Sequence, residues 1–424
     1  MKKGFLFLMM GLMVWGFSLK AQASTRVDSM SMDVREVNDI DLIWIYPNMV
    51  MDYKNTIDFR LGNLNGAGVS EWGGAIVGMT DNLGVWGVYV NRPKVQYNDA
   101  KNLFISPLPL MTSYWSSLGS YFFGSTPIFG PSTTNNAIDA FYANKFGDVN
   151  LGGRITYDED FLTNIGGGPF GNNIQSENWG FSLGIGLNDW AGFKQANFHV
   201  DYDVNFFTSD RYPYFLGTIP AVENQGVQSL RFGTLMDYTL SKDTNLRLFG
   251  DAKFDQYKWE FWFGPIELDY NQKNIDLGAA FNQTVFDGKA TLTSGLILDY
   301  YGAKELDITD GQVQESWDAL WNAGGEAEVA DWLTIRTGIE FPLYSRDWGG
   351  IFMPGSGNFY FSNANANTVA FSTGVGINFE NFILDLKINE SSLDTSINNV
   401  NPGKGLFTAG NMLTVGEADM KYKF

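Results

Sequence analysis

The feature that most constrains this chain is a two-residue alternation of apolar and polar side chains. In Asn197–Phe206 every even-numbered residue is apolar and every odd-numbered residue is polar. Successive side chains of a β-strand point to opposite faces, so the pattern predicts strands with one apolar face and one polar face. The same alternation recurs in Val149–Tyr157, Leu333–Leu343, Val369–Phe379 and Phe382–Ile388.

Strand spacing favours a membrane barrel over a soluble sandwich. Short turns alternate with connections that are mostly long, such as 92–134, 159–177 and 391–411. Outer-membrane barrels have short periplasmic turns on one rim and long extracellular loops on the other. We therefore predict an all-β fold, a transmembrane antiparallel β-barrel of about 16 strands, with 14 as the alternative because the first two segments are weak. The predicted strands are 48–62, 72–80, 83–91, 135–147, 149–158, 178–188, 195–207, 227–240, 244–258, 272–285, 289–302, 318–329, 332–345, 367–379, 381–390 and 412–424.

The first residues have the pattern of an export signal. Lys2 and Lys3 precede an apolar run, and Ala21-Gln22-Ala23 is a small-x-small cleavage site. No second run is apolar and long enough for a membrane helix. We expect a signal peptide at 1–23, an N-terminal periplasmic segment at 24–47 and the barrel at 48–424, located in a bacterial outer membrane.

Composition and charge exclude several classes of function. The formal net charge is −19 and there are no cysteines, which argues against nucleic acid as a partner and excludes thiolate metal sites. The one histidine, His199, lies between polar neighbours and is expected to be a hydrogen-bonded wall residue. We expect no enzymatic activity, cofactor or bound metal; the acidic stretches 158–160 and 307–311 are interpreted as solvated loops.

Aromatic residues mark the expected membrane boundary and the chain end. Six of them flank the short turns as one interfacial girdle: Phe146, Trp190, Phe286, Trp332, Phe379 and Phe382. In the last strand Met420, Tyr422 and Phe424 share a face. This ending resembles the signal by which outer-membrane proteins are recognised for insertion. The expected partners are therefore outer-membrane lipid, the barrel-insertion machinery and an unidentified small-molecule solute; the sequence leaves the oligomeric state open.

Two stretches resemble the long-chain fatty acid transporter family. The segment Asn38–Asn48 is similar to an acidic stretch that leads to an aromatic residue and an Asn-Pro-Ala step, with Tyr46 in place of the Asn and Asn48 in place of the Ala. The segment Gly374–Phe379, followed by Leu384-Asp385, also resembles that family. The resemblance implies a 14-strand barrel that moves hydrophobic compounds.

Alternation assigns charges of both signs to the inner face, which predicts a wet, polar interior. A barrel of this size can hold an aqueous channel, although a salt-bridged wall that conducts little is the alternative. The pore-lining candidates are Arg154, Asp201, Asp203, Arg231, Asp237, Asp251, Lys253, Glu326, Arg336 and Glu340. The same face includes Arg247, Asp255, Asp276, Asp299, Glu328, Asp385 and Lys387.

Within the predicted loop 92–134, residues 101–131 are too apolar to remain in water, so they are expected to bury themselves in the barrel, at its mouth or on a partner. The aromatic residues Trp115, Tyr121, Phe122 and Phe123 of this loop are candidates for a constriction or a ligand-binding site. The leading functional hypothesis is an outer-membrane channel that passes small solutes by passive diffusion and is restricted by this loop. The alternatives are a hydrophobic-compound transporter of the fatty acid type and a non-conducting barrel that acts as a scaffold or assembly subunit.

Overall fold

The computed structural model describes most of the predicted strands and the segment that precedes them. The described residues are 24–63, 72–78, 83–92, 137–165, 172–209, 212–214, 217–219, 222–223, 227–261, 266–305, 313–349, 369–388 and 415–424. The predicted signal peptide and most of loop 92–134, including its four candidate aromatic residues, lie outside this set. Among the described residues, no helix is both long enough and apolar enough to cross a membrane.

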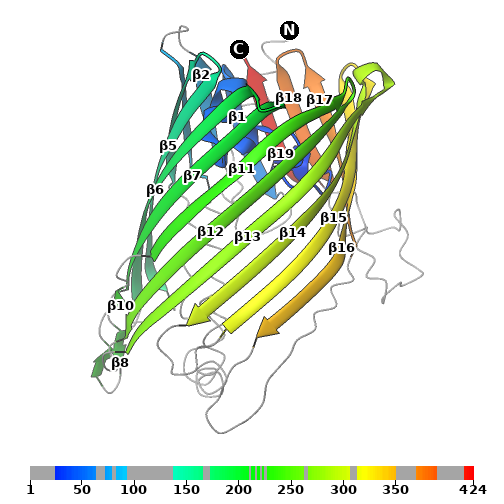
Figure 1. Ribbon diagram of the computed structural model, residues 1–424. Coiled ribbons are helices and arrows are strands. Elements are labelled where there is room, and N and C mark those ends of the chain that lie inside the picture. Colours follow the sequence, from blue (N-terminus) through cyan, green and yellow to red (C-terminus); the bar gives the residue numbers. More distant parts are fainter. Residues whose placement is uncertain are drawn as a thin grey trace, which may run out of the picture.

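The strands form one closed, all-antiparallel barrel of 16 strands (Figure 1). The barrel closes because β1 pairs with both β2 and β19, so no edge strand is left unpaired. The barrel strands are β1 (Thr56–Asn63), β2 (Trp72–Gly78), β3 (Val85–Val90), β4 (Ile138–Phe146), β5 (Val149–Ile165), β6 (Asn172–Trp190), β7 (Phe193–Ser209), β11 (Val227–Ser241), β12 (Thr244–Phe261), β13 (Ile266–Val285), β14 (Ala290–Glu305), β15 (Val313–Ala330), β16 (Leu333–Gly349), β17 (Ala370–Phe379), β18 (Phe382–Ile388) and β19 (Val415–Lys423).

Four further short elements complete the strand region. The two-residue β10 (Val222–Glu223) pairs with the end of β7, and β8 (Tyr212–Tyr214) pairs with β9 (Gly217–Ile219). The 3-10 turn η3 (Phe286–Gly288) connects β13 to β14. The predicted count of 16 strands is therefore confirmed and the alternative of 14 is wrong.

In the part of the barrel that the structure describes, the strands on one side are longer than those on the other. Strands β5–β7 and β11–β16 contain between 15 and 20 residues, whereas β1–β4 and β17–β19 contain between 6 and 10. At about 3.3 Å per residue the longer strands exceed the 9–11 residues that cross a bilayer. They extend away from the short turns (Figure 1). The predicted loop 159–177 is accordingly mostly strand, since β5 continues to Ile165 and β6 begins at Asn172.

The outer face of the barrel is apolar and the inner face is polar. On β6 and β7 the cross-strand neighbours Leu183 and Val200 are 69% and 50% exposed, whereas His199 and Asp201 are buried. An exposed apolar belt around a closed barrel fits hydrocarbon, where every backbone group must be paired internally. Five girdle aromatics are exposed beside the short turns: Phe146, Trp190, Phe286, Trp332 and Phe379.

Residues 24–53, which we call the N-terminal plug, fold inside the barrel near the short-turn end (Figure 1). The plug contains the helix α2 (Thr25–Asp28) and two 3-10 helices, η1 (Ile40–Trp44) and η2 (Pro47–Tyr53). The predicted strand beginning at residue 48 is therefore wrong over its first part. The expected periplasmic segment 24–47 instead lies against the inner wall, because its apolar and charged side chains match those of the wall.

Candidate functional site

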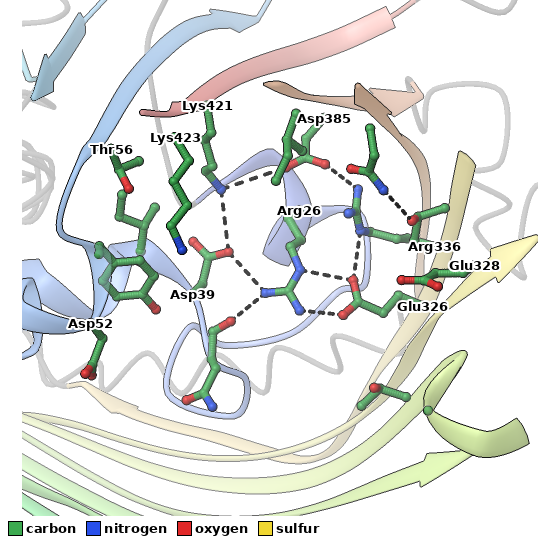
Figure 2. Close-up of a pocket in the computed structure, with 18 of the residues that line it drawn as sticks. Arg26, Asp39, Asp52, Thr56, Glu326, Glu328, Arg336, Asp385, Lys421 and Lys423 are labelled. Atoms are coloured by element: carbon green, nitrogen blue, oxygen red, sulfur yellow. Dashed lines mark hydrogen bonds and ion pairs between the residues drawn. The ribbon is translucent and has the colours of Figure 1, made fainter. Parts of the chain in front are cut away.

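The plug is attached to one side of the wall by a chain of ion pairs (Figure 2). Arg26 donates to both oxygens of Glu326 on β15, at 3.0 and 2.5 Å, and lies 3.3 Å from Asp39 within the plug. Arg336 on β16 bridges Glu326 at 3.1 Å and Asp385 on β18 at 2.7 Å. The guanidinium of Arg26 thus links the plug to three strands of the wall, β15, β16 and β18.

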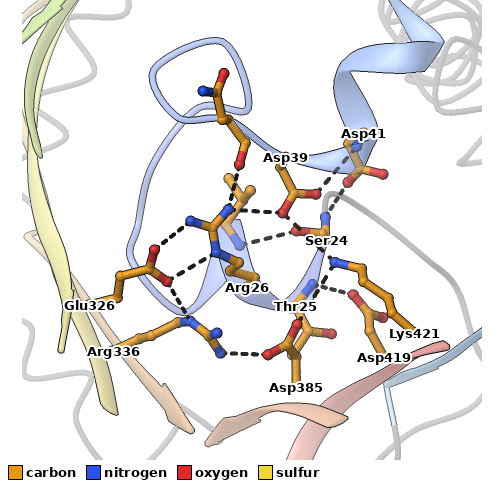
Figure 3. A network of polar contacts seen from close by, with 12 residues as sticks. Ser24, Thr25, Arg26, Asp39, Asp41, Glu326, Arg336, Asp385, Asp419 and Lys421 are labelled. Carbon is orange, nitrogen blue, oxygen red and sulfur yellow. Dashed lines mark hydrogen bonds and ion pairs between the residues drawn. The ribbon is translucent and has the colours of Figure 1, made fainter. Parts of the chain in front are cut away.

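A second ionic cluster lies where β1 and β19 close the barrel (Figure 3). Arg60 on β1 forms a two-point ion pair with Asp41 of the plug, with one contact at 2.8 Å. Lys421 on β19 lies 3.8 Å from Asp39 and from Asp385. Although burial opposes it, Lys421 and Arg26 hold the pKa of the Asp39 carboxyl well below its usual range. Asp39 is therefore an anion that joins both clusters.

A third group of contacts holds the central part of the plug. Arg35 pairs with Asp33 in the plug and with Asp276 on β13 at 3.0 Å. Glu36 accepts a hydrogen bond at 3.0 Å from the amide of Asn322 on β15. Burial raises the pKa of the Glu36 carboxyl to about 7, so this carboxyl of the plug titrates near neutral pH.

His199 faces the plug between two carboxylates. Its Nδ1 lies 3.2 Å from Asp201 and its Nε2 lies 3.0 Å from Asp251, which also accepts from Arg231 at 2.6 Å. The ring of Tyr46 in the plug meets the imidazole edge to face, with centroids 5.0 Å apart. The prediction of a hydrogen-bonded wall histidine agrees with this geometry.

An aromatic cluster seats the middle of the plug against the short strands. The indole of Trp44 packs edge-on against Trp72, Tyr89 and Phe141, with centroids 5.6, 4.8 and 5.0 Å apart. All four side chains are buried. Edge-to-face pairs at these distances add to the stabilisation from burial alone. The cluster adjoins the ionic attachment, because the guanidiniums of Arg60 and Arg92 lie over the rings of Trp72 and Trp44.

Glycines hollow the wall where the plug comes closest. A Cβ on Gly152 of β5 or on Gly184 of β6 would overlap Pro47 or Asn48 of the plug. A Cβ on Gly324 or Gly338 would likewise meet Met30. Interior strand glycines mark a close approach of another backbone. The wall is therefore shaped to the plug, and these glycines are the sequence signal that could have located the contact.

Among the residues that the structure describes, two of the cavities between the plug and the wall are lined mainly by polar residues. The larger of the two, drawn in Figure 2, has a volume of about 460 Å³. Its lining includes the turn residues Gly288, Lys289 and Asn381. The smaller, of about 230 Å³, includes Arg247 and Asp237 in its lining. Arg26 and Glu326 line both cavities. The space next to the plug is thus lined largely by charged and polar side chains.

The structure places all ten pore-lining candidates on the inner face, either by burial or by pairing opposite an inward-facing residue. Two contact the plug directly: Arg154 donates to the Trp44 carbonyl at 2.7 Å, and Glu326 binds Arg26. Glu340 lies opposite Asn322, the partner of Glu36. The others occur in wall pairs or lie on the same face: Asp201, Asp203, Arg231, Asp237, Asp251, Lys253 and Arg336.

The chain end lies at the seam of the barrel. Tyr422 on β19 is paired with Ile57 of β1 and with Phe382 of β18, and Met420 lies opposite Phe59. The backbone N–H of Phe424 donates to the Asn55 carbonyl at 3.0 Å. The predicted insertion signal thus belongs to the strand that closes the barrel. Within the described residues, no cluster of potential metal ligands occurs.

The closed barrel, its apolar outer belt and its charged interior define a bacterial outer-membrane β-barrel protein. No family model matches the chain, and no curated protein matches it. Similar solved structures include the alcaligin receptor FauA of Bordetella pertussis, at 9% identity and a TM-score of 0.43, covering 86% of this chain and 55% of the receptor. The chain therefore spans little more than half the length of that receptor.

Two other similar structures have lengths closer to that of this chain. The toluene transporter TodX of Pseudomonas putida is 9% identical with a TM-score of 0.37, over 96% of both chains. The translocator domain of NalP from Neisseria meningitidis is 13% identical with a TM-score of 0.30, over 66% of this chain and 90% of that domain.

Proposed function

We propose that this protein is an outer-membrane channel for small polar solutes and that the N-terminal plug closes its short-turn end. The observation that carries the proposal is the ionic attachment of the plug through Arg26 to Glu326 and Asp39. Contacts of this kind can break and re-form without a covalent step. Arg26 and Glu326 line both cavities, and we expect their separation to open a connection between the two.

We assign the short-turn end to the periplasm and the extended strand ends to the outside. The passage would then be restricted from two directions, by the plug on the inside and by loop 92–134 on the outside. Labelling with an impermeant thiol reagent in intact cells tests the assignment, since a cysteine in place of Lys242, in the β11–β12 turn, should remain unlabelled. The absence of native cysteines makes this experiment direct.

A disulfide lock tests whether the plug must move. The hydroxyls of Ser31 in the plug and Ser372 on β17 are in direct contact, so the pair Ser31→Cys and Ser372→Cys can link the plug to the wall. We expect the oxidised double variant to lose conductance in planar bilayers and to regain it on reduction, with the two single variants as controls. Equal conductance in both redox states would contradict a moving plug.

A transporter of hydrophobic compounds is the second candidate, and the aromatic cluster around Trp44 favours it. That cluster joins the plug to the short strands with four buried rings. Uptake of a small aromatic hydrocarbon and of a sugar into liposomes, in both redox states of the lock, discriminates the two functions. Redox-controlled sugar uptake supports the polar channel, whereas redox-controlled hydrocarbon uptake supports the second candidate. Failure of both supports a scaffold.

A further inference from the structure

Ser24, the first described residue, lies completely buried within the plug rather than at its surface (Figure 3). Its backbone nitrogen donates to Oδ2 of Asp41 at 2.5 Å. The next backbone nitrogen, that of Thr25, donates to Oδ2 of Asp419 on β19 at 2.7 Å. Two consecutive nitrogens are therefore directed at two carboxylates in the seam cluster.

Carboxylates outnumber cations at this position, among the residues that the structure describes. Four carboxylates and three cations take part, and two of these cations also contact a wall carboxylate outside the cluster, Arg26 with Glu326 and Lys421 with Asp385. The carboxylates are Asp39, Asp41, Asp58 and Asp419, and the cations are Arg60, Lys421 and Arg26. Buried carboxylates are costly unless they are paired with positive charge. One more positive charge next to Asp41 would balance the four carboxylates of this cluster.

We propose that removal of the signal peptide after Ala23 supplies this cation, as the α-ammonium group of Ser24 paired with Asp41. Hydrolysis of the Ala23–Ser24 peptide bond adds the hydroxyl of water to the Ala23 carbonyl carbon and a proton to the Ser24 nitrogen. The released amine takes up a second proton at neutral pH. The small-x-small sequence Ala21-Gln22-Ala23 is the pattern that a signal peptidase of the export pathway cleaves.

Processing would then strengthen the contact that seats the plug. Before cleavage, the Ser24 nitrogen is a neutral amide with one hydrogen to donate, and the preceding chain would have to continue from a fully buried residue. After cleavage, the same atom has a full charge and three hydrogens. Charge-assisted hydrogen bonds are roughly twice as strong as neutral ones. The nitrogen that binds Asp41 therefore gains its function from the processing step.

Chemical labelling of the purified full-length protein tests the proposal and does not depend on whether the barrel conducts. Mass spectrometry should find Ser24 as the first residue of the mature chain. Reductive methylation should modify the Ser24 α-amine at least tenfold more slowly in the folded barrel than in the heat-unfolded protein. A mature chain that begins elsewhere, or an α-amine that reacts at the same rate in both states, would overturn the proposal.

Displacing the amine provides a second test. Insertion of two glycines between Ala23 and Ser24 moves the amine by up to about 7 Å along the chain, and it should then react at the unfolded rate. The matched control Ser24→Ala keeps an ammonium in place and removes only the Ser24 Oγ contact to the Val27 N–H, so it should retain protection. Continued protection in the insertion variant would overturn the proposal. If that variant does not fold, the comparison of folded and unfolded parent protein decides the question.

Discussion

Arg26 and Glu326 form a two-point ion pair across 300 residues of sequence. The guanidinium Nε lies 3.0 Å from Oε2 and Nη2 lies 2.5 Å from Oε1, with the side chains 22% and 21% exposed. This geometry matches the planar fork of arginine to the two oxygens of one carboxylate. The pair fixes both the position and the orientation of the plug relative to β15.

Removing this pair should loosen the plug. Arg26→Gln leaves Glu326 with Arg336 alone and is expected to cost about 1.5 kcal/mol of plug docking, which raises the fraction of time in the open state about tenfold. Single-channel recording measures that fraction. The control Lys242→Gln removes a charge at an exposed turn and should leave it unchanged. A folded Arg26→Gln barrel with parental opening would contradict the attachment.

Filling a hollow under the plug should have a similar effect by a steric route. Gly152→Ala places a methyl group against Asn48, and overpacking of this kind costs about 1–3 kcal/mol. The neighbouring Gly153→Ala is the matched control, because its Cβ would meet no atom closer than the Ser182 carbonyl at 3.6 Å. Thermal unfolding followed by the heat-modifiable gel shift, together with conductance, compares the two. If both variants unfold at the same temperature and conduct equally, the wall does not fit the plug closely at Gly152.

Plug docking should weaken as pH rises toward neutrality. The pKa of Glu36 is raised from 4.5 to about 7 by burial, so the docked plug binds a proton more tightly than the released plug. The resulting stabilisation is complete below pH 4.5 and is lost as pH rises through about 7. The open probability of the channel should therefore increase over this interval. In Glu36→Gln it should no longer change with pH and should stay at the value that the parent protein has at low pH. An unchanged pH profile in Glu36→Gln would assign the dependence to another group.

The apolar belt predicts a depth-dependent penalty for charge on the outer face. Leu183 lies seven residues from the β6–β7 turn and is 69% exposed. Leu183→Arg should destabilise the folded barrel in lipid by about 2–4 kcal/mol if the site is near the bilayer midplane. Leu183→Ile is the control. Equilibrium unfolding of the protein inserted in vesicles measures this loss of stability. A loss smaller than that expected at the membrane interface would show that Leu183 lies outside the apolar belt.

The terminal strand should be required for assembly. Deletion of Phe424 removes the aromatic end of β19, the strand that pairs with β1 at the seam. We expect loss of the heat-modifiable folded form from outer membranes, whereas Phe424→Tyr should assemble normally. If the variant that lacks Phe424 is recovered in the folded form at the parental yield, the insertion machinery uses another signal.

The barrel could be predicted from the sequence because a bilayer requires a two-residue period on every crossing strand. Above the membrane that requirement ends, and strand pairing continues without it. The segment 266–271 of β13 has acidic or polar residues at Glu267, Asp269 and Asn271, which indicated a loop, yet it forms strand paired with β12. The predicted loops were therefore too long on the side where the strands extend beyond the bilayer.

The plug was missed because its shape depends on a lumen that no local pattern describes. Its apolar residues near Met49 and Val50 suggested a first strand, and short apolar runs do not distinguish strand from helix. Pro47, at the first turn of η2, was the local sign of a helical start. The alternation assigned these charges to the inner face, where the structure places them, but their partners in the plug follow only from the folded chain.

Because of its glycines, the inner surface of the barrel wall is complementary in shape to the plug. Gly152 and Gly184 leave space for Pro47-Asn48, and Gly324 and Gly338 leave space for Met30. A foreign N-terminal segment grafted onto this barrel would not fit the spaces left by these glycines. The native segment grafted onto a barrel without these glycines would clash with wall side chains. Redesign of this protein must therefore treat residues 24–53 and the strands beneath them as a single interchangeable part.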